Sequence, residues 1–306
     1  PNACALRTLL LKKDACCSLQ IDNKGISFYE MMQLTSAEQK RYDTAADTIM
    51  VYEAYIEKPY AISILCDIFD EVMHSKAPAD FSKLSENQSV VRDLFNVGRD
   101  RIEIKDRIYA AMRDISQFFQ QESLVDILTK IALIHYQFEM LRPFPSLNGV
   151  IGRMGISMLL FEAGFRAAPF LCISDFLLQN TEAYFSQLSS TQRNGDYLSW
   201  IKFMLGGFTS AAKKSITLIE QYEALVVKDS GKVKKFAFSE NIFVVYDCYK
   251  TNLTAEIPEA ATNLNLSFNT VSKAVELLQK KKILELVNKQ VRHRKFKYRK
   301  AADLFV

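Results

Sequence analysis

Residues 124–141, LVDILTKIALIHYQFEML, are apolar on almost every side when they are drawn as a helix. Such a helix has no broad face to turn toward water, so other elements must surround it. No apolar run in the chain approaches the length needed to span a bilayer, so the surrounding elements must be protein. The segment therefore predicts a buried central helix in a mainly α-helical fold that does not use a membrane.

The composition agrees with a helical fold. The 306 residues contain only 10 Gly and 7 Pro, which favours helices over a turn-rich sandwich. Hydrophobic residues make up 49% and charged residues 24%, as in ordinary soluble proteins, and the length suggests about two domains. The opening PNACALRTLLLKK lacks the features of a signal peptide, so we expect a cytoplasmic protein.

The cysteines and histidines show no ligand spacing. The six cysteines form no C-x-x-C pair, and the three histidines (His74, His135 and His293) lie far apart in the sequence. We therefore expect the cysteines to be small buried apolar residues in a reducing compartment, and we expect no metal cluster of Cys or His.

Charge is distributed unevenly along the chain. From Lys228 to the end there are 16 Lys and Arg against 8 Asp and Glu, a net charge of +8, so the rest must carry −4 to give the total of +4. The polar, basic stretch KDSGKVKK begins at the same residue and is predicted to be a linker. We accordingly predict an N-terminal helical segment, a core domain, a linker and a C-terminal domain: 1–50, 51–227, 228–237 and 238–306.

The last domain is predicted to be a winged helix-turn-helix. Three helical stretches (SENIFVVYDCYK, TAEIPEAATNLN and SFNTVSKAVELLQKKK) precede the strand-like alternation of ILELVNKQVRHRKFKY, as in that fold. Ser267 would cap a recognition helix whose outward residues near its N-terminus suit base contacts: Asn269, Thr270 and Lys273. The β-ribbon carries basic residues suited to phosphate contacts, among them Arg292, Arg294, Lys295 and Lys297.

DNA is one of two partners that this domain could take. Glu276 on the recognition helix works against DNA, and the ribbon's charges could simply be solvated. The alternative is a winged helix that docks a second copy of the chain, as a homodimer, or another protein. Further upstream, SVVRDLFNVGRDRIEIKD (89–106) has short β-branched alternations around a Gly and is predicted to be a weak hairpin.

The stretch RPFPSLNGVIGR (142–153) interrupts the helical pattern. Asn148 and Gly149 can adopt positive φ at low cost, and a helix that starts there would point its N–H groups and positive dipole end at one place, which suits a phosphate. Arg153 follows one turn later, and Arg142 is held extended or in a turn by Pro143. On these residues alone, a plain turn between two helices is the simpler alternative.

Together with the helix before it, HYQFEMLRPFPSLNGVIGR (135–153) resembles the core motif of Fic-domain proteins, H-P-F-x-[D/E]-G-N-G-R-x-x-R. The register holds without gaps, and five positions match: Pro143, Phe144, Asn148, Gly149 and Arg153. Four positions depart from the motif. The catalytic His position is Arg142, the metal-binding acid position is Ser146, the first glycine is Leu147, and the first arginine is Val150.

The resemblance extends over nearly the whole chain. SLQIDN (18–23) is similar to the family's inhibitory motif [S/T]-x-x-x-E-[G/N] through Ser18, Asp22 and Asn23, with Asp22 in place of Glu. VRDLFNVGRDR (91–101) would be the β-hairpin flap that docks the target, and the segment around Trp200 is also similar. A C-terminal winged helix is common in the family, so the resemblance implies a Fic-like helical core, a small hairpin flap and a winged helix.

The resemblance implies transfer of AMP from ATP to a hydroxyl group on a target protein. In the family the His accepts the hydroxyl proton, the acid holds Mg²⁺ and the loop holds the phosphates. Arg142 stays protonated and cannot be a general base, and Ser146 is a poor Mg²⁺ anchor beside a carboxylate. His135, seven residues earlier in an apolar helix, is more simply explained as a core histidine. We therefore predict a phosphate-binding loop with impaired or lost transferase activity; an active adenylyltransferase and a DNA-binding regulator are the alternatives.

The inhibitory-like pair has two interpretations. In the family the acid of the inhibitory motif pairs with the second arginine and blocks the γ-phosphate, and here the charges persist as Asp22 and Arg153. The pair could control nucleotide binding, or it could only hold the N-terminal helix to the core, since removal of one partner of a partly buried pair is destabilising.

Overall fold

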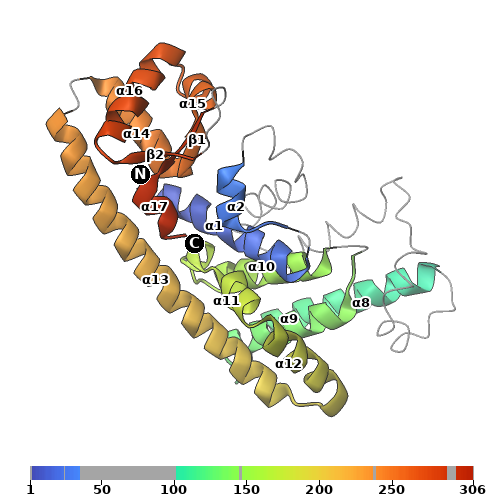
Figure 1. Cartoon of the computed structure of the whole chain (residues 1–306). Helices are drawn as coiled ribbons and strands as arrows, with labels where there is room; N and C mark the ends of the chain where they lie inside the picture. Colours follow the sequence, from blue (N-terminus) through green and yellow to red (C-terminus); the bar gives the residue numbers. More distant parts are fainter. Residues whose placement is uncertain are drawn as a thin grey trace. The chain divides into compact units, whose positions relative to one another are not determined.

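A computed structural model describes most of the chain as helices with one small sheet (Figure 1). The described residues are 2–23, 25–34, 101–144, 147–236, 239–287 and 294–305. They fall into two compact units, each treated by itself below. The first comprises 1–53, 170–175 and 210–306, and the second comprises 54–169 and 176–209.

The second unit is built around helix α9 (Ile127–Leu141). Most residues of α9 from Lys130 on are buried, among them Ile131, Ala132, Ile134 and His135. The prediction of a central buried helix is confirmed from Ile127 on, whereas residues 124–126 of the predicted stretch precede the helix and are exposed. Asp126 caps its first turn by accepting a hydrogen bond from the Thr129 N–H group at 3.0 Å. The unit also contains α8 (Arg101–Gln120), α10 (Asn148–Glu162), the turn η2 (Ala168–Phe170) up to Pro169, the end of α11 (Ile173–Gln179), α12 (Thr181–Asn194) and the first turns of α13 (Tyr197–Phe236).

Helices α9 and α10 pack closely because α10 presents Gly152 to its neighbour. A Cβ atom at this position would lie 2.9 Å from the Phe138 ring and 3.0 Å from Glu139 Oε1, both on α9. On the other side of α9, the indole N–H group of Trp200 donates a hydrogen bond to the Ala132 carbonyl at 2.8 Å. The first contact sets how closely α9 and α10 approach, and the second holds α13 against α9.

The first unit contains the N-terminal helices and the C-terminal elements. Helix α1 (Asn2–Ile21) is buried along most of its length and packs on α2 (Phe28–Gln33) and α14 (Glu240–Asn252). A capping box starts α2, since the Ser27 hydroxyl accepts from the Glu30 N–H group while the Glu30 carboxylate accepts from the Ser27 N–H group. The segment after α1 passes close to it, because a Cβ atom at Gly25 would lie 2.8 Å from Leu19 Cβ.

The C-terminal elements of this unit surround a three-stranded antiparallel sheet with the order β1-β3-β2. In the register of the sheet, Phe296 of β3 faces Ala255 of β1 and Leu286 of β2. The elements after α14 are β1 (Thr254–Glu256), α15 (Ile257–Asn263), α16 (Phe268–Lys280), β2 (Leu284–Leu286), β3 (Lys295–Tyr298) and α17 (Arg299–Asp303). The predicted β-ribbon strands are confirmed. The stretch predicted to be wholly helical begins instead with β1, and the winged-helix assignment stays a prediction.

A buried polar cluster joins β3 to the later part of α13. The Tyr298 hydroxyl donates to Asp229 Oδ2 at 3.1 Å and lies 3.1 Å from the Tyr246 hydroxyl of α14. Burial raises the pKa of Tyr298 and of Tyr246 above the ordinary value for tyrosine, so both hydroxyls stay protonated at neutral pH. The packing of α13, α14 and β3 removes these three polar groups from water, and the bonds within the cluster supply their hydrogen-bond partners.

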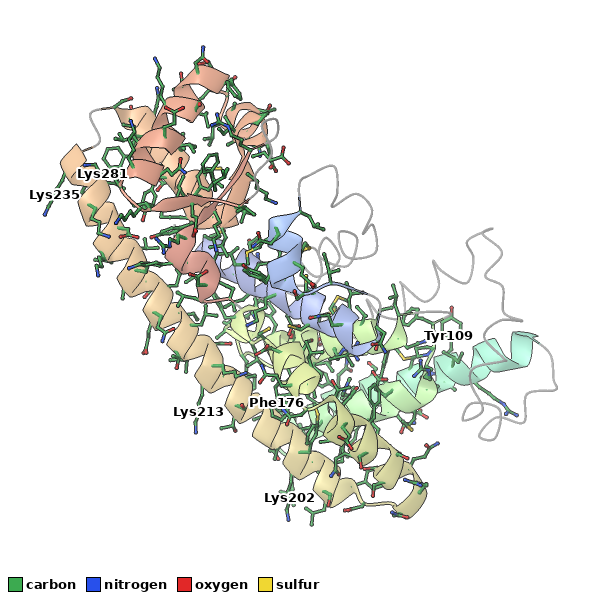
Figure 2. The ribbon with its side chains drawn as sticks, viewed as in Figure 1. Tyr109, Phe176, Lys202, Lys213, Lys235 and Lys281 are labelled. Carbon is green, nitrogen blue, oxygen red and sulfur yellow. The ribbon has the colours of Figure 1, made fainter. Side chains whose placement is uncertain are left out.

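The segment predicted to be a linker, 228–237, is helical as far as Phe236, because α13 continues through it. Its polar composition hides a helical period, since Tyr222, Val226, Asp229 and Val233 recur at helical spacing and are all buried. Its lysines point to solvent, and Lys235 projects outward near the end of α13 (Figure 2). The domain boundaries themselves stay predictions.

The hairpin predicted over 89–106 is wrong for its last six residues, which form the first turns of α8. Glu103, Lys105 and Arg107 are good helix formers, and their propensity outweighs the short β-branched alternation. The rest of that hairpin, with residues 91–100 of the predicted docking flap, lies outside the described residues. Within the described ranges, no helix has the length and apolar character needed to cross a bilayer.

Candidate functional site

The loop between α9 and α10 starts at Arg142. This residue closes α9 in the left-handed conformation (φ 44°, ψ 59°), and its backbone N–H group donates to the Phe138 carbonyl at 3.0 Å. Its guanidinium is exposed, whereas Pro143 and Phe144 are buried. The Phe144 ring packs on the Phe138 ring with a centroid distance of 6.1 Å. The loop is thus anchored by an apolar ring while its cationic side chain stays accessible.

Asn148, the first residue of α10, fixes the other end of the loop. Its side-chain oxygen accepts a hydrogen bond from the Phe144 N–H group at 2.8 Å, and its side-chain N–H group donates to the Phe144 carbonyl at 2.6 Å. Asn148 is 2% exposed. The amide therefore bonds to both the N–H group and the carbonyl of Phe144, as a neighbouring strand would, and these two bonds hold the loop's shape.

Leu147 precedes α10 in the left-handed conformation (φ 60°, ψ 19°). Helix α10 starts at Asn148 as predicted, but the positive φ values of the loop fall on Arg142 and Leu147 and not on Asn148 and Gly149, which are helical. This conformation suits glycine and costs a residue with a Cβ roughly 1–2 kcal/mol. It explains why the resembling motif has glycine at position 147, and it shows that leucine still supports the turn.

Helix α10 starts without a side-chain cap, since Leu147 has no polar atom with which to bind an N–H group. The first turn of α10 also contains no acidic residue. Of the remaining matched or replaced positions, Val150 is 3% exposed and Arg153 is completely buried. A positive helix end with a buried arginine one turn inside favours anions over cations. Ser146 lies outside the described residues.

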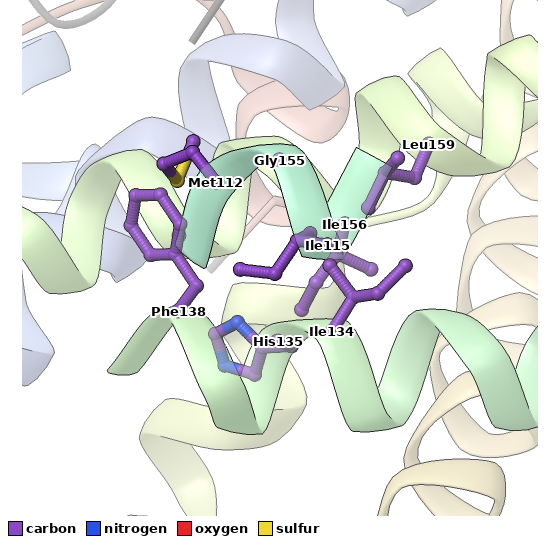
Figure 3. A pocket seen from close by; sticks show the side chains of 9 residues that line it. Met112, Ile115, Ile134, His135, Phe138, Gly155, Ile156 and Leu159 are labelled. Carbon is purple, nitrogen blue, oxygen red and sulfur yellow. The ribbon is translucent and has the colours of Figure 1, made fainter. Parts of the chain in front are cut away.

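His135 lies in the core of the second unit, where it lines a small pocket between α8, α9 and α10 (Figure 3). Its Nε2 atom is 3.0 Å from the Tyr184 hydroxyl, and its ring stacks on that of Trp200 with a centroid distance of 6.0 Å. Burial, followed by the nearby charge of Arg153, lowers the pKa of His135 to about 3, against a weaker opposite effect of the Gly152 backbone. The interpretation of His135 as a core histidine is confirmed.

The residues of the inhibitory-like motif end helix α1. Ser18 is buried, Asp22 forms a turn with its N–H group donating to the Leu19 carbonyl at 3.2 Å, and Asn23 is exposed with φ 55°. Asp22 belongs to the first unit and Arg153 to the second. Their pairing therefore stays a prediction.

The residues predicted to bind DNA divide into two groups. Asn269 and Lys273 are exposed and Thr270 is half-buried on α16, whose N-cap Ser267 accepts from the Thr270 N–H group at 3.1 Å, as predicted. On the ribbon, Lys295 is 3% exposed and its ammonium donates to the Leu34 carbonyl. Lys297 faces Asp303 at 3.4 Å, and Arg294 is half-buried. Arg292 lies outside the described residues.

Magnesium, which the family resemblance implies, has no described anchor in the loop. None of the described residues from Arg142 to Arg153 carries a carboxylate, and Asn148 is engaged with Phe144. Across the described parts of the chain, no group of three or more His, Cys, Asp or Glu residues is placed to hold a metal ion. The described residues do not fit the metal, so the chemistry below is derived from the chain alone.

Sequence reasoning missed the environment of two residues. Tyr184 sits on α12, 49 residues from its partner His135, and no local pattern connects them. Lys295 is predicted to contact phosphate, but its side chain is buried on the face of β3 opposite Phe296 and Tyr298, where alternation alone gives no sign of cover.

No family model matches the sequence. The chain is 30% identical over 81 residues to a probable protein adenylyltransferase of Aquifex aeolicus, a match that spans 26% of this chain and only 23% of that protein. A crystal structure of a Fic family protein from Desulfovibrio desulfuricans is similar with a TM-score of 0.47 and 15% identity, covering 96% of this chain and 87% of the other. The name of the Aquifex aeolicus relative agrees with the resemblance to Fic-domain proteins that the core motif predicts.

Proposed function

We propose that this chain is a Fic-type protein whose α9–α10 loop binds ATP, ADP or a related phosphate compound, and whose AMP-transfer activity is impaired or lost. The observation that carries the proposal is the pair of hydrogen bonds by which Asn148 holds Phe144. They preserve the shape of a loop that leads into an uncapped helix N-terminus, although the reactive groups of the resembling motif are replaced.

Binding is supported by charge. The positive end of α10 and the exposed Arg142 guanidinium both attract an anion, and the guanidinium offers several donors to phosphate oxygens. Arg153 adds a buried positive charge within α10, and its field contributes to the low pKa of His135. These groups need no metal to select a phosphate over an uncharged ligand.

Loss of transfer is supported by the absence of a base in the described part of the loop. Proton transfer from the target hydroxyl needs an unprotonated group within reach. Arg142 cannot be that group, because a guanidinium stays protonated at physiological pH. His135 is unprotonated but buried, and its Nε2 atom already meets Tyr184. Loss of a general base lowers rates by roughly 10²–10⁴.

Calorimetric titration of Mg-ATP and ADP into the full chain tests the binding. We expect binding by the wild type and a loss of at least about tenfold in affinity for Arg142→Glu, because a hydrogen bond to a charged group contributes roughly 1.5–3 kcal/mol. Arg193→Glu is the matched control, since it makes the same charge change at an exposed residue of the same unit. Equal affinity for all three proteins, or no binding at millimolar nucleotide, would contradict the phosphate site.

Two further measurements separate the alternatives. Incubation with ATP labelled at the α-phosphate tests for transfer to protein targets, and rapid labelling that Arg142→Glu abolishes would support an active adenylyltransferase instead. Titration of Asp22→Gly tests the inhibitory-like motif. Tighter nucleotide binding would support control by Asp22, whereas unchanged affinity with lower stability would support a purely structural role.

The C-terminal elements offer a second candidate function, which is binding of DNA or a protein through α16. It is favoured by the exposure of Asn269 and Lys273 on that helix, while Lys295 of the ribbon is buried and Lys297 is paired with Asp303. Phe268, which is 50% exposed at the start of α16, equally suits a protein partner. If the protein retains DNA in a salt-dependent way and Lys273→Glu weakens that retention, DNA binding through α16 is supported. If neither salt nor Lys273→Glu changes the retention, α16 is excluded as the DNA contact.

A further inference from the structure

Helix α1 meets the segment before and at the start of α11 (Ile173–Gln179) through one of its faces, within the first unit. Asp14 Oδ1 accepts a hydrogen bond from the Ser174 N–H group at 2.7 Å, and the Lys13 ammonium lies 3.8 Å from Asp175 Oδ1. Cys17 lies on the same face, one helical turn after Asp14. The two backbone segments are thus held together independently of any thiol.

Cys17 and Cys172 both lie at this junction, and Cys17 is among the groups that raise the pKa of Cys172. Their side chains are 5% and 7% exposed. A disulfide needs Cα atoms about 4.4–6.8 Å apart, and the bond between Asp14 and the Ser174 backbone brings the two segments together on this face of α1. Both cysteines carry free thiols.

The other described cysteines have different surroundings. The Cys16 thiol is directed to Met31 Sδ at 3.8 Å, and Cys248 on α14 lies 3.7 Å from the Asn252 side-chain nitrogen. Cys4 is exposed near the start of α1. Among the described cysteines, Cys17 and Cys172 are therefore the pair that lies at one junction between two segments, with both side chains nearly buried.

We propose that Cys17 and Cys172 form an intramolecular disulfide when the protein is exposed to a peroxide. One thiolate attacks a peroxide oxygen, and an S–O bond forms as the O–O bond breaks. That sulfur becomes a sulfenic acid, and the other peroxide oxygen takes up a proton and leaves as water. The second sulfur then attacks the first, the S–S bond forms, and the hydroxyl group departs with the remaining thiol proton as a second water. The two thiols are oxidised and the peroxide is reduced. This modification site is independent of the proposed function.

The reaction should be slow at neutral pH. Burial and the neighbouring Asp14 carboxylate raise the pKa of Cys172 well above its ordinary value, and only thiolates attack efficiently. The rate of disulfide formation should therefore rise with pH. A disulfide that forms slowly and is buried should accumulate during prolonged exposure to peroxide and should not respond to a brief exposure.

Peptide mapping of the full chain identifies the bond directly. The wild-type protein is incubated with hydrogen peroxide, its remaining thiols are alkylated, and it is digested with trypsin without reductant. We expect a cross-linked species joining residues 14–24 to residues 167–193, lighter than the sum of the two peptides by two hydrogen atoms, which dithiothreitol separates. A cross-link that never includes 167–193, or oxidation confined to Cys4, overturns the proposal.

Variants assign the bond to one sulfur of the Cys16–Cys17 pair. Cys17→Ser and Cys172→Ser should abolish the cross-link, while Cys16→Ser and Cys4→Ser should retain it. Persistence in Cys17→Ser would assign the bond to Cys16 and contradict the proposal. Oxidation of the wild type should also raise Tm by several degrees, because the bond closes a loop of well over a hundred residues. The wild-type peptide map decides the matter even if a serine variant folds poorly.

Discussion

The side chain of Asn148 forms two hydrogen bonds with the backbone of Phe144, accepting from its N–H group at 2.8 Å and donating to its carbonyl at 2.6 Å. Both partners are buried, so water cannot replace either bond. The two residues close the loop between α9 and α10 and determine where Arg142 emerges from it. The loop's shape is therefore maintained by a residue that matches the Fic motif, while its reactive positions differ.

Asn148→Ala should lower the free energy of unfolding by about 2–4 kcal/mol, because it removes two buried hydrogen bonds to the Phe144 backbone. Chemical denaturation followed by circular dichroism measures the loss. Asn194→Ala is the control, since its amide makes one 3.3 Å bond at an exposed position and should change stability by less than about 0.5 kcal/mol. Equal effects of the two variants would show that the Phe144 pairing contributes nothing specific.

The environment of His135 predicts a pH-dependent stability. Burial lowers its pKa to about 3, so between about pH 3 and the ordinary value of about 6.5 the unfolded chain binds a proton that the folded chain does not. His135 therefore adds no pH dependence above about pH 6.5. Below it, His135 destabilises the fold by about 1.4 kcal/mol per pH unit as the pH falls.

His135→Gln tests this effect, because glutamine can still bond to Tyr184 but does not titrate. Urea denaturation at several values between pH 7.5 and pH 5 should show that the variant loses less stability than the wild type as the pH falls. The slope of the unfolding free energy against pH should correspond to about one bound proton fewer in the variant. The variant's lower stability at pH 7.5 is expected and is not the readout. Parallel curves for the two proteins would mean that His135 is protonated in the folded state.

Leu147 predicts an inverted order of two substitutions. At an exposed helical position such as Ser186, alanine is more stable than glycine by about 1 kcal/mol. At Leu147, where φ is 60°, glycine should instead be the more stable by about 1 kcal/mol, because it alone avoids the Cβ clash of the left-handed conformation. Comparison of Leu147→Gly with Leu147→Ala cancels the lost leucine contacts. If alanine is the better residue at both sites, position 147 is not left-handed in solution.

Much of the fold follows from periodicity in the sequence. The apolar stretch 124–141 predicts the buried helix α9, and the alternation before Tyr298 predicts the paired strands β2 and β3. Composition misleads where it masks a period. Residues 228–236 are rich in lysine and contain a glycine, yet Asp229 and Val233 continue the buried stripe of α13, so the expected linker is a helix.

The site is predictable only in part. The sequence motif indicates the loop between two helices, and the structure adds that Asn148 is a structural clamp and that the left-handed residues are Arg142 and Leu147. No local pattern predicts that Tyr184 approaches His135, because that contact depends on the tertiary packing of α9 and α12. The inward direction of Lys295 likewise depends on a backbone carbonyl more than two hundred residues away.

Two neighbouring glycines of α13 should respond oppositely to alanine. A Cβ atom at Gly207 would lie 2.7 and 2.8 Å from two atoms of the Phe176 ring, whereas a Cβ atom at Gly206 would meet nothing within 4 Å. Gly207→Ala should therefore destabilise the second unit by roughly 1–3 kcal/mol through overpacking. Gly206→Ala should stabilise it by about 0.5–1 kcal/mol, because alanine has the higher helix propensity and the site is open.

Thermal unfolding of both variants gives the comparison. Because the substitutions are chemically identical and adjacent on one helix, the difference between them isolates the contact with Phe176. Gly207→Ala combined with Phe176→Leu provides a rescue, since the smaller side chain leaves room for the added methyl group, and the double variant should lose less than the sum of the single variants. Destabilisation by Gly206→Ala of the same size as that by Gly207→Ala would mean that α13 is not a continuous helix at this point.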